Sequence, residues 1–531
     1  MSSYGVLLAL LGAILISGAH GANILGVFSC PAPSHLIIEM SMAKVLAENG
    51  HNVTVVTTLQ PVVTHKNIKV ILVPMTKEQQ EGLNKMMASV MQTDNSDTGT
   101  AFLRMRSQLK IMFDKNREVM EDQRVKDLYE NKDNKFDLVM LGYFLNNFQL
   151  AIAQKLKVPV VIASSTFQWG VFDSMTANPA DIAYVPAMGV NFNKGPIDLK
   201  QRFSNFISTL FEKLFVYLIE KDNAEVYYDL YGNDPDMPTY DELNRNVSLV
   251  LFNSHGISEG PIRPNVPGVI EVGGIQVKDT PDPLPQAMSE FLNNATDGAI
   301  LLSLGSNIQG KYLNPETVQK MFKVLSKLKQ RVIWKWEDVD NTPGKSANIL
   351  YSKWLPQDDI LAHPKIVLFI NHAGRGGITE SQYHGKPMLS LPVFGDQPGN
   401  ADKMVSDGFG LSMSLLALEE KPFRDNVIEL LENPKYTQKV KAFSELFRDR
   451  PLTARQTVLY WTEYVLRHHG APHLQSPLLR LSFVEAHNID VYAVILVALV
   501  VILFINKIAL QLLYRKLTGK SKKNTNAKKT N

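Results

Sequence analysis

The side chains best suited to hold a nucleotide gather between residues 354 and 397. The short apolar run 365–370 ends in a glycine-rich turn, and a helical pattern follows from about residue 378 to 384. Such a turn brings backbone N–H groups and the positive end of a helix dipole close to an anion. His372 adds a polar side chain at the end of the same strand. The pattern predicts a phosphate-binding turn that contains Gly374, Gly376 and Gly377.

Other side chains in this stretch could hold the rest of a nucleotide. Trp354 supplies a flat ring that suits stacking on a base. Glu380 lies about one turn into the predicted helix, on the face that could reach a ribose hydroxyl. A second predicted strand, 387–391, ends in a loop that carries Asp396 and Gln397. Strand, turn, helix, strand and polar loop make up half of a nucleotide-binding α/β domain, although a glycine-rich turn alone is weak evidence.

The complete pattern is far more specific than the turn. It begins with Trp-x-Pro-Gln at 354–357, continues through His372 and Glu380, and closes with Pro-x-x-x-Asp-Gln at 392–397. This pattern resembles the signature of the UDP-glycosyltransferase family, of the membrane-bound animal type. The resemblance covers about residues 23 to 515 and implies an α/β, GT-B fold. In that fold two Rossmann-like domains face each other across a cleft.

The resemblance also implies a role for each residue of the pattern. Trp354 would stack on uracil and Gln357 would contact the uridine. His372 and the turn amides of Gly374, Gly376 and Gly377 would take the diphosphate. Glu380 would bind the ribose hydroxyls, and the donor sugar hydroxyls would fall to Asp396 and Gln397. The residues themselves add Ser306, in a turn after the predicted strand 300–303, whose backbone could approach the diphosphate.

Two residues of the pattern depart from the family. Asn371 stands where Ser or Thr is usual, and Gly376 stands where many members carry a side chain that bonds phosphate. Both departures affect the expected affinity for the UDP-sugar, but the pattern still indicates a nucleotide-binding site.

The N-terminal half starts with a strand at 23–28, a helix to about residue 48 and a strand at 53–57. His35 lies between the first strand and the helix, and the surrounding residues also resemble the family. There the histidine at this place is the general base that takes the proton of the acceptor hydroxyl. Imidazole suits that work because its pKa lies near neutrality. From the residues alone, a loop histidine satisfied by the backbone is the commoner case, and we expect His51 to be structural.

Gly142 is the most informative departure in the chain. It follows the predicted strand 136–141, at the place where the family usually carries an Asp that orients and charges the catalytic histidine. A carboxylate behind a histidine fixes its tautomer and stabilises the imidazolium. Asp137 lies at the far end of the strand and is a poor substitute, so a carboxylate from elsewhere would have to fill the gap.

Two stretches leave their role open. The first, 60–135, is polar and helical, and its apolar residues could face a pocket or pack as an amphipathic helix; they are Met86, Met87, Val90, Met91, Leu103, Met105 and Leu109. The second, 165–245, carries aromatic residues at roughly helical spacing, which could line an acceptor pocket, lie near a membrane surface or form an ordinary core helix; they are Phe203, Phe206, Phe211, Phe215 and Tyr217.

Bulk composition narrows the class of protein. The 531 residues exceed one compact domain, the net charge of +3 gives no argument for nucleic acid, and the single cysteine, Cys30, excludes an intramolecular disulfide. No metal-ligand spacing occurs in the sequence, since the adjacent His468 and His469 would not face one site on a helix. Members of the family are not known to need a metal, and the UDP-sugar is a co-substrate, so no cofactor is expected.

The two ends of the chain predict a membrane-anchored, secretory-pathway protein. Residues 1–22 look like a signal peptide, with an apolar run and a small-residue cleavage region. The apolar run 491–505 extends past Lys507 and suits a single membrane span, which needs about twenty residues. A basic tail follows, so the positive-inside rule places the tail in the cytoplasm and the folded part in the lumen. Lys528 and Lys529 resemble a dilysine retrieval signal for the endoplasmic reticulum.

The predicted domain organisation follows from these segments. We expect a signal peptide at 1–22, an acceptor domain at 23–262, a UDP-sugar domain at 263–445, helices crossing back to the first domain at 446–488, a transmembrane helix at 489–510 and a tail at 511–531. Asn246 and Asn294 lie in Asn-x-Ser/Thr sites and are the expected positions of glycosylation, Asn294 above all. The residues leave a homo-oligomer open.

The predicted activity is a single inverting displacement. His35 would deprotonate a hydroxyl of a small lipophilic acceptor, which would attack the anomeric carbon of a UDP-sugar carrying glucose or glucuronic acid. The alternative is a transfer-impaired homologue that binds lipophiles or UDP-sugars, because Gly142 replaces the usual partner of the base. A nucleotide-dependent dehydrogenase is excluded, since no Gly-x-Gly-x-x-Gly follows the first strand.

Overall fold

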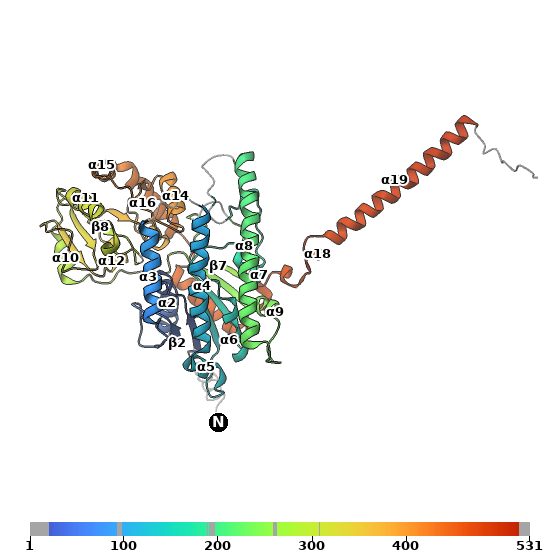
Figure 1. The fold of residues 1–531 in the computed structure, drawn as a ribbon, viewed down its shortest axis with the longest axis horizontal. Helices are drawn as coiled ribbons and strands as arrows, with labels where there is room; N and C mark the ends of the chain where they lie inside the picture. Colours follow the sequence, from blue (N-terminus) through green and yellow to red (C-terminus); the bar gives the residue numbers. More distant parts are fainter. Residues whose placement is uncertain are drawn as a thin grey trace, which may run out of the picture. The chain divides into compact units, whose positions relative to one another are not determined.

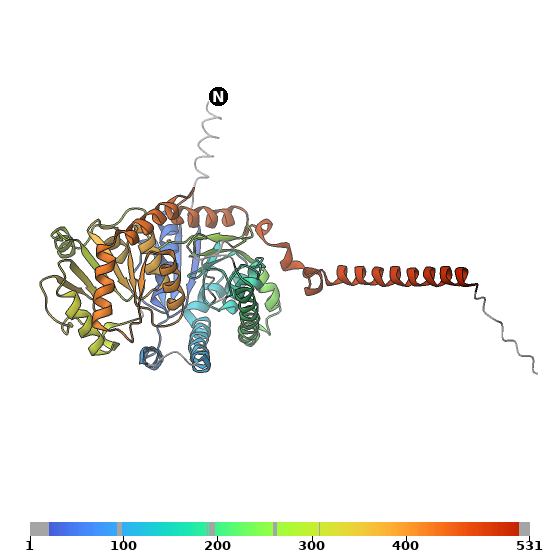
Figure 2. The ribbon, with the colours of Figure 1, turned by 90° about the horizontal axis from the view of Figure 1, so that it is seen from above.

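The computed structural model describes residues 21–92, 98–187, 190, 197–258, 263–306 and 308–519. The chain forms two compact units, Met1–Ser476 and Pro477–Asn531. The first unit holds two parallel β-sheets with helices packed around them (Figures 1 and 2). The second unit holds two helices, α18 (Phe483–Ala486) and α19 (Ile489–Thr518), after a short 3-10 turn at Pro477–Arg480. The signal region 1–20 and the pair Lys528 and Lys529 lie outside the described residues.

Seven parallel strands form the first sheet in the order β3-β2-β1-β4-β5-β6-β7. The strands are β1 (Asn23–Phe28), β2 (Asn52–Thr57), β3 (Ile68–Leu72), β4 (Leu138–Tyr143), β5 (Val160–Ser164), β6 (Val247–Phe252) and β7 (Val269–Glu271). The helices that accompany them are α2 (Pro33–Glu48), α3 (Lys77–Gln92), α4 (Thr98–Glu121), α5 (Gln123–Glu130), α6 (Ala151–Leu156), α7 (Asp173–Thr176), α8 (Leu199–Tyr231) and α9 (Tyr240–Arg245). Helices α3, α4 and α8 run roughly parallel on one side of this sheet (Figures 1 and 2).

Six parallel strands form the second sheet in the order β10-β9-β8-β11-β12-β13. The strands are β8 (Ala299–Ser303), β9 (Arg331–Lys335), β10 (Ile349–Ser352), β11 (Ile366–Asn371), β12 (Met388–Ser390) and β13 (Gly410–Ser412). The helices are α10 (Gln286–Asn293), α11 (Pro315–Leu325), α12 (Gln357–Ala362), α13 (Arg375–His384), α14 (Gln397–Asp407), α15 (Glu420–Glu432), α16 (Pro434–Arg448) and α17 (Ala454–Arg467). Short 3-10 turns occupy Asn147–Leu150, Gly170–Phe172, Gly310–Tyr312 and Pro472–Leu474.

The central strands are mostly apolar, as expected for strands of a parallel sheet that is covered on both faces. Every residue of β4, β5, β6 and β8 is buried. Each sheet reverses its strand order once, between β1 and β4 in the first sheet and between β8 and β11 in the second. In open parallel sheets, ligands bind beyond the carboxyl ends of the strands at such a reversal. The topology therefore marks two places for function, one after β1 and β4 and one after β8 and β11.

The C-terminal part of the first unit ties the two sheets together. Helix α17 packs against α2 of the first sheet, and Arg455 of α17 forms an ion pair with Glu48 at 2.7 Å. Arg450 donates a hydrogen bond to the carbonyl of Gly273 at 2.8 Å. The ring of His255, after β6, stacks on Phe447 of α16 at 4.3 Å between centroids. These contacts link the residues after 446 to the first sheet.

Several element predictions were incomplete. Strands β3, β7 and β13 were not predicted, and β7 extends the first sheet beyond the expected boundary at 262/263. Helix α13 starts at Arg375, three residues before the expected start, so the glycine-rich segment is itself the first turn of the helix. Strand β4 continues through Gly142 and Tyr143.

The structure shows where part of the stretches 60–135 and 165–245 lies. Leu109 packs in the core beneath the first sheet, while the other named side chains of 86–105 lie outside the described ones. Helix α8 is a core helix in its C-terminal half, where Ile219, Tyr227 and Tyr231 are buried. Four of the five named aromatic residues, Phe203, Phe206, Phe211 and Tyr217, are exposed, whereas Phe215 packs on the core. Helix α19, described by itself, is long and apolar enough to cross a membrane.

Candidate active site

His372 lies at the strand-order reversal of the second sheet, directly after β11. Its ring occupies space that only glycine leaves open: a Cβ built on Gly305 would lie 2.4 Å from Cε1 of His372, and one on Gly374 would lie 2.3 Å from Nε2. The Nδ1 atom has no hydrogen-bond partner among the residues that the structure describes. Burial, with a smaller effect of nearby Lys335, lowers the pKa of His372 to about 4. The imidazole is therefore neutral at physiological pH and can donate one N–H to an anion.

The turn after β11 is shaped by Asn371. Its Oδ1 accepts hydrogen bonds from the backbone N–H of Ala373 at 2.8 Å and from the hydroxyl of Ser390 at 2.9 Å. Ala373 has a φ of 60°, a left-handed conformation that a non-glycine residue rarely adopts without support. Gly374 is the N-cap of α13 and offers no side chain to its free N–H groups. Asn371 thus holds the turn that presents the positive end of α13, which explains its place in the pattern.

The expected ribose and uridine contacts are assembled in one place. Nε2 of Gln357, the first residue of α12, donates to Oε2 of Glu380 on α13 at 2.6 Å. Glu380 is buried, and burial together with nearby Asp358 raises its pKa to about 8. Trp354 is 48% exposed on the loop between β10 and α12, so its ring is accessible for stacking.

The loop after β12 is fixed by its own side chains. Oε1 of Gln397 accepts hydrogen bonds from the backbone N–H of Val393 at 2.8 Å and of Phe394 at 3.1 Å. Oδ2 of Asp396 accepts one from Asn400 at 2.6 Å, and Asn400 also donates to the carbonyl of Ala373 at 3.1 Å. Asn400 therefore links the Asp396 loop to the His372 turn. Burial raises the pKa of Asp396, and the hydrogen bond from Asn400 opposes that rise.

The remaining expected residues lie around the same turn. Ser303 pairs with Asn371 across β8 and β11, which places the turn containing Gly305 and Ser306 beside that of His372. A Cβ on Gly377 would make ordinary contacts with Phe369 and Gln357 at 3.4 and 3.5 Å. A Cβ on Gly376 would meet only the side-chain nitrogen of Gln276, at 3.8 Å. Gly376 thus leaves room for a larger side chain.

Arg375 was not singled out from the sequence, although it begins α13 inside the pattern. Its Nη2 donates to the hydroxyl of Ser258 at 2.9 Å, and that hydroxyl donates to Gln382 at 2.7 Å. Burial lowers the pKa of Arg375 to about 10, and nearby Asp396 opposes the change, so the guanidinium stays charged at neutral pH. A long cation at a position between two glycines was the signal that could have identified it. Arg375 joins the first turn of α13 to the segment after β6.

His35 lies at the strand-order reversal of the first sheet, in the first turn of α2 rather than in a loop. Its Nδ1 is 2.8 Å from the hydroxyl oxygen of Ser165, which follows β5. Its ring meets Phe144 edge-on at 5.0 Å between centroids. Burial lowers the pKa of His35 to about 4, so the imidazole is neutral and can accept a proton.

Gly142 brings an unexpected residue to this site. A Cβ built on Gly142 would lie 2.6 Å from Cδ of Glu39 and 2.7 and 2.9 Å from its two carboxyl oxygens. Glu39 is on α2, four residues after His35, and its side chain is fully buried. Burial raises the pKa of Glu39 to about 8. Asp137, by contrast, accepts a hydrogen bond from the backbone of Asn23 at the opposite end of the sheet.

His51 has the structural role expected of it. Its Nδ1 accepts a hydrogen bond from the backbone N–H of Ala22 at 3.1 Å, and its Nε2 lies 3.5 Å from Glu463 of α17. Both contacts are at the start of the first sheet, away from the carboxyl ends of the strands.

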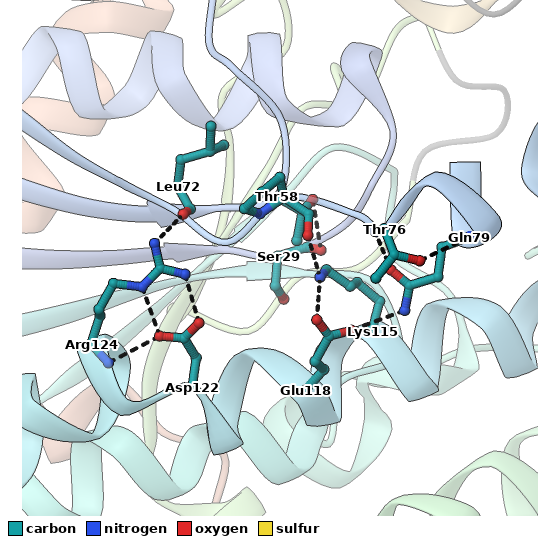
Figure 3. Close-up of polar contacts among 10 residues, drawn as sticks. Ser29, Thr58, Leu72, Thr76, Gln79, Lys115, Glu118, Asp122 and Arg124 are labelled. Carbon is teal, nitrogen blue, oxygen red and sulfur yellow. Dashed lines mark hydrogen bonds and ion pairs between the residues drawn. The ribbon is translucent and has the colours of Figure 1, made fainter. Parts of the chain in front are cut away.

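A buried lysine holds α4 across the carboxyl end of the first sheet (Figure 3). Nζ of Lys115 donates to the carbonyl of Pro74, just after β3, at 2.8 Å and to Glu118 at 2.9 Å. Figure 3 shows its side chain reaching toward Ser29 and Thr58, which follow β1 and β2. These bonds tie α4 to the segment that follows β3.

Two further expectations concern glycosylation and metal binding. Asn246 and Asn294 are both exposed, as glycosylation requires, and so is Asn52. No cluster of three or more His, Cys, Asp or Glu side chains suited to a metal occurs in the described part of the chain.

Comparison with known proteins gives a consistent result. Residues 27–524 match the model of the family described as "UDP-glucoronosyl and UDP-glucosyl transferase". The chain is 32% identical over 517 residues to UDP-glucosyltransferase 2 of Dactylopius coccus, covering 95% of each protein. It is 29% identical over 391 residues to UDP-glucuronosyltransferase 1A8 of Homo sapiens, covering 73% of this chain and 72% of the relative.

Solved structures show the same fold. The glycotransferase of kitacinnamycin superposes with a TM-score of 0.55 at 16% identity, covering 85% of this chain and all of that one. A UDP-glucosyltransferase from Polygonum tinctorium superposes with a TM-score of 0.54 at 16% identity, covering 85% of this chain and 99% of that one. The two parallel sheets are thus those of a GT-B glycosyltransferase.

Proposed function

Because the chain belongs to the UDP-glucuronosyl and UDP-glucosyl transferase family, we propose that it transfers glucose or glucuronic acid from a UDP-sugar to a hydroxyl of a small lipophilic acceptor. One observation carries the proposal. The strand-order reversal of each sheet holds a histidine that is neutral at physiological pH, His35 in the first sheet and His372 in the second. UDP-glycosyltransferases need both a UDP-sugar site and an acceptor base.

The proposed reaction is one displacement with inversion at the anomeric carbon. His35 takes the proton of the acceptor hydroxyl while the acceptor oxygen forms its bond to C1. The bond between C1 and the diphosphate oxygen breaks, and its electron pair leaves with UDP. The N-terminus of α13 and the N–H of His372 stabilise the charge that grows on the diphosphate. The proposal includes no cofactor, since the UDP-sugar is consumed as a co-substrate.

The donor roles are proposed residue by residue. Trp354 stacks on the uracil, Gln357 and Glu380 hold the uridine, and Asp396 and Gln397 hold the sugar hydroxyls. The amides of Gly374, Gly376 and Gly377 and the turn at Ser306 surround the diphosphate. The hydrogen bonds that fix Glu380 and the 393–397 loop support these assignments, because a donor site must be held in place before the sugar arrives.

We further propose that α19 anchors the protein in the membrane of the endoplasmic reticulum. Its apolar composition and the basic residues that follow it support a single span with the folded unit in the lumen. Acceptors that partition into membranes would then be concentrated near the enzyme. Oligomeric state is not part of the proposal.

A second function, a binding protein with impaired transfer, is favoured by Gly142. The family's carboxylate is missing from that position, and loss of a comparable Asp in a serine hydrolase costs about 10⁴ in rate. The retained donor residues argue against it, because a protein that binds lipophiles without transfer has no need of Asp396 and Gln397.

The test is release of UDP by membranes that contain the full chain. UDP-glucose and UDP-glucuronate are each offered with a panel of phenols and lipophilic alcohols. We expect turnover with one donor, and a loss of about 10²- to 10⁴-fold in His35→Ala, which is the usual contribution of a general base. His468→Ala, an exposed histidine at the end of α17, is the matched control and should keep wild-type activity.

The two functions give different results. Wild-type turnover that disappears in His35→Ala supports the transferase and its donor preference identifies the sugar. Binding of a UDP-sugar without any UDP release in the wild type supports the binding protein instead.

A further inference from the structure

We propose that Glu39 is a positioning residue for the transfer reaction: its carboxylate acts through His35 and performs the role that Gly142 leaves unfilled. The inference rests on the proposed function, because it concerns the base of that reaction. It differs from the usual arrangement of the family in one respect, since the carboxylate comes from the helix of the histidine and not from strand β4.

The position of the Glu39 side chain is the first support. The carboxyl group stands within 2.6 to 2.9 Å of the point where a side chain on Gly142 would begin. A side chain at 142 would therefore force the Glu39 carboxyl to move from this position. Glycine at 142 thus leaves the space that the Glu39 carboxyl occupies.

Helix geometry supplies the second support. His35 and Glu39 are four residues apart on α2, so they lie on one face with their Cβ atoms about 5–6 Å apart. That face points at β4, where Gly142 pairs with Ala163 of β5. Ser165, two residues after Ala163, contacts His35 Nδ1. The histidine thus has a hydroxyl at one ring nitrogen and a carboxyl on the same side of its helix.

The third support is that no hydrogen bond or ion pair holds the Glu39 carboxyl in the described part of the chain. Both of its carboxyl oxygens are buried and have no hydrogen-bond partner there. An unsatisfied buried carboxyl lowers stability, by about 1–3 kcal/mol or more for a polar group of this kind. Such groups concentrate at functional sites, where the cost is offset by activity.

In the described part of the chain, the charged and titratable groups packed around Glu39 include no cation that would compete with His35 for its carboxylate. The Cys30 thiol, on the loop before α2, has its pKa raised by burial and by Glu39. Strands β1, β4 and β5 carry no charged side chain, and the hydroxyl of Tyr143 donates instead to Asn147 and to the carbonyl of Val171. From α17, Arg455 pairs with Glu48 at the far end of α2.

The chemical consequence is a dependence on the ionisation of Glu39. When His35 takes the acceptor proton it becomes an imidazolium, which an ionised Glu39 stabilises and a protonated Glu39 does not. The rate should therefore rise with pH as Glu39 loses its proton, although the imidazole of His35 is already neutral. The apparent pKa of that rise belongs to the pair.

The first test compares three variants of the full chain in membranes. Glu39→Gln keeps the shape and removes the charge, and Glu39→Met removes the carboxyl altogether. Both should lower kcat at least about tenfold, leave KM for the UDP-sugar unchanged and abolish the alkaline rise in rate. Glu48→Gln, an acid on the same helix away from the site, is the matched control and should behave as wild type.

The exchange variant separates positioning from folding. Gly142→Asp alone should be inactive, because it places a second carboxyl against the first. Combined with Glu39→Met, the same Asp restores the carboxylate from the strand and should recover most of the lost rate. A folding role for Glu39 would give no such recovery.

The reactivity of His35 can be measured without any sugar transfer. Modification of His35 by diethyl pyrocarbonate, followed by mass spectrometry, should accelerate between about pH 7 and 9 in the wild type, around the pKa of about 8 of Glu39. It should be flat in Glu39→Gln. Identical profiles in the two proteins, or wild-type kcat in both Glu39 variants, would overturn the inference even if the wild type transfers sugar. A wild type that never releases UDP contradicts the proposed function, and the modification profile then still decides whether Glu39 acts on His35.

Discussion

Two neutral histidines stand at matching places in the two sheets and have opposite surroundings. His372 follows β11, near the cation Lys335 and at the N-terminus of α13, and its ring is enclosed by Gly305 and Gly374. His35 follows β1 and shares its helix with the buried acid Glu39. Positive surroundings suit a histidine that donates an N–H to an anion, whereas an acid suits one that becomes an imidazolium. The difference supports the proposal that His372 binds the diphosphate and that His35 takes the acceptor proton.

The largest expected effect comes from disturbing the enclosure of His372. Gly305→Ala would place a methyl group 2.4 Å from the His372 ring at a residue whose φ is 78°. We expect kcat/KM for the UDP-sugar to fall about 100-fold, because such strain costs about 1–3 kcal/mol and moves the ring. Steady-state kinetics with varied donor measures the effect. Gly376→Ala is the matched control and should be nearly neutral, since its Cβ has ordinary space.

A smaller effect should appear in stability as a function of pH. Each half of the unit holds a buried carboxyl whose pKa is raised to about 8, but Glu380 is bonded to Gln357 and Glu39 has no partner in the described residues. Between about pH 4.5 and 8 the folded protein keeps the proton of Glu39 while the unfolded chain loses it. Folding stability from this group is full below pH 4.5 and declines as the pH rises, by at most about 1.4 kcal/mol per pH unit.

Replacing Glu39 by Met removes that decline and leaves the one from Glu380. The difference in melting temperature between Glu39→Met and the wild type should therefore grow in favour of the variant from pH 5 to pH 8. Thermal unfolding in detergent at several pH values measures it. A difference that stays constant with pH would show that Glu39 is ionised throughout.

The smallest expected effect is a gain in donor affinity. Gly376 occupies a position in the first turn of α13 where a Cβ meets only the Gln276 side chain at 3.8 Å. Gly376→Asn should lower KM for the UDP-sugar a few-fold, because an amide there adds a donor near the diphosphate and removes the flexibility of glycine from the helix. Gly376→Leu, of similar size without the donor, should not lower KM.

The two halves also differ in how much their sequence predicts. All the expected donor residues except Ser306 lie within 354–397, so local spacing was enough to predict a strand, a glycine-rich turn, a helix and a polar loop there. The His35 site depends on contacts between distant segments, and no local pattern shows that Glu39 of α2 reaches Gly142 of β4. Strands β7 and β13 have three residues each and are defined by pairing with β6 and β12, so their own residues carried too weak a signal.

The measurement closest to the central claim is binding of the UDP-sugar to His35→Ala and His372→Ala, followed by quenching of tryptophan fluorescence, to which Trp354 contributes. We expect His35→Ala to bind the donor as tightly as the wild type while its transfer rate falls about 10²- to 10⁴-fold, and His372→Ala to bind the donor at least about tenfold more weakly. Weakened binding in His35→Ala, or unchanged binding in His372→Ala, would contradict the assignment of the two histidines.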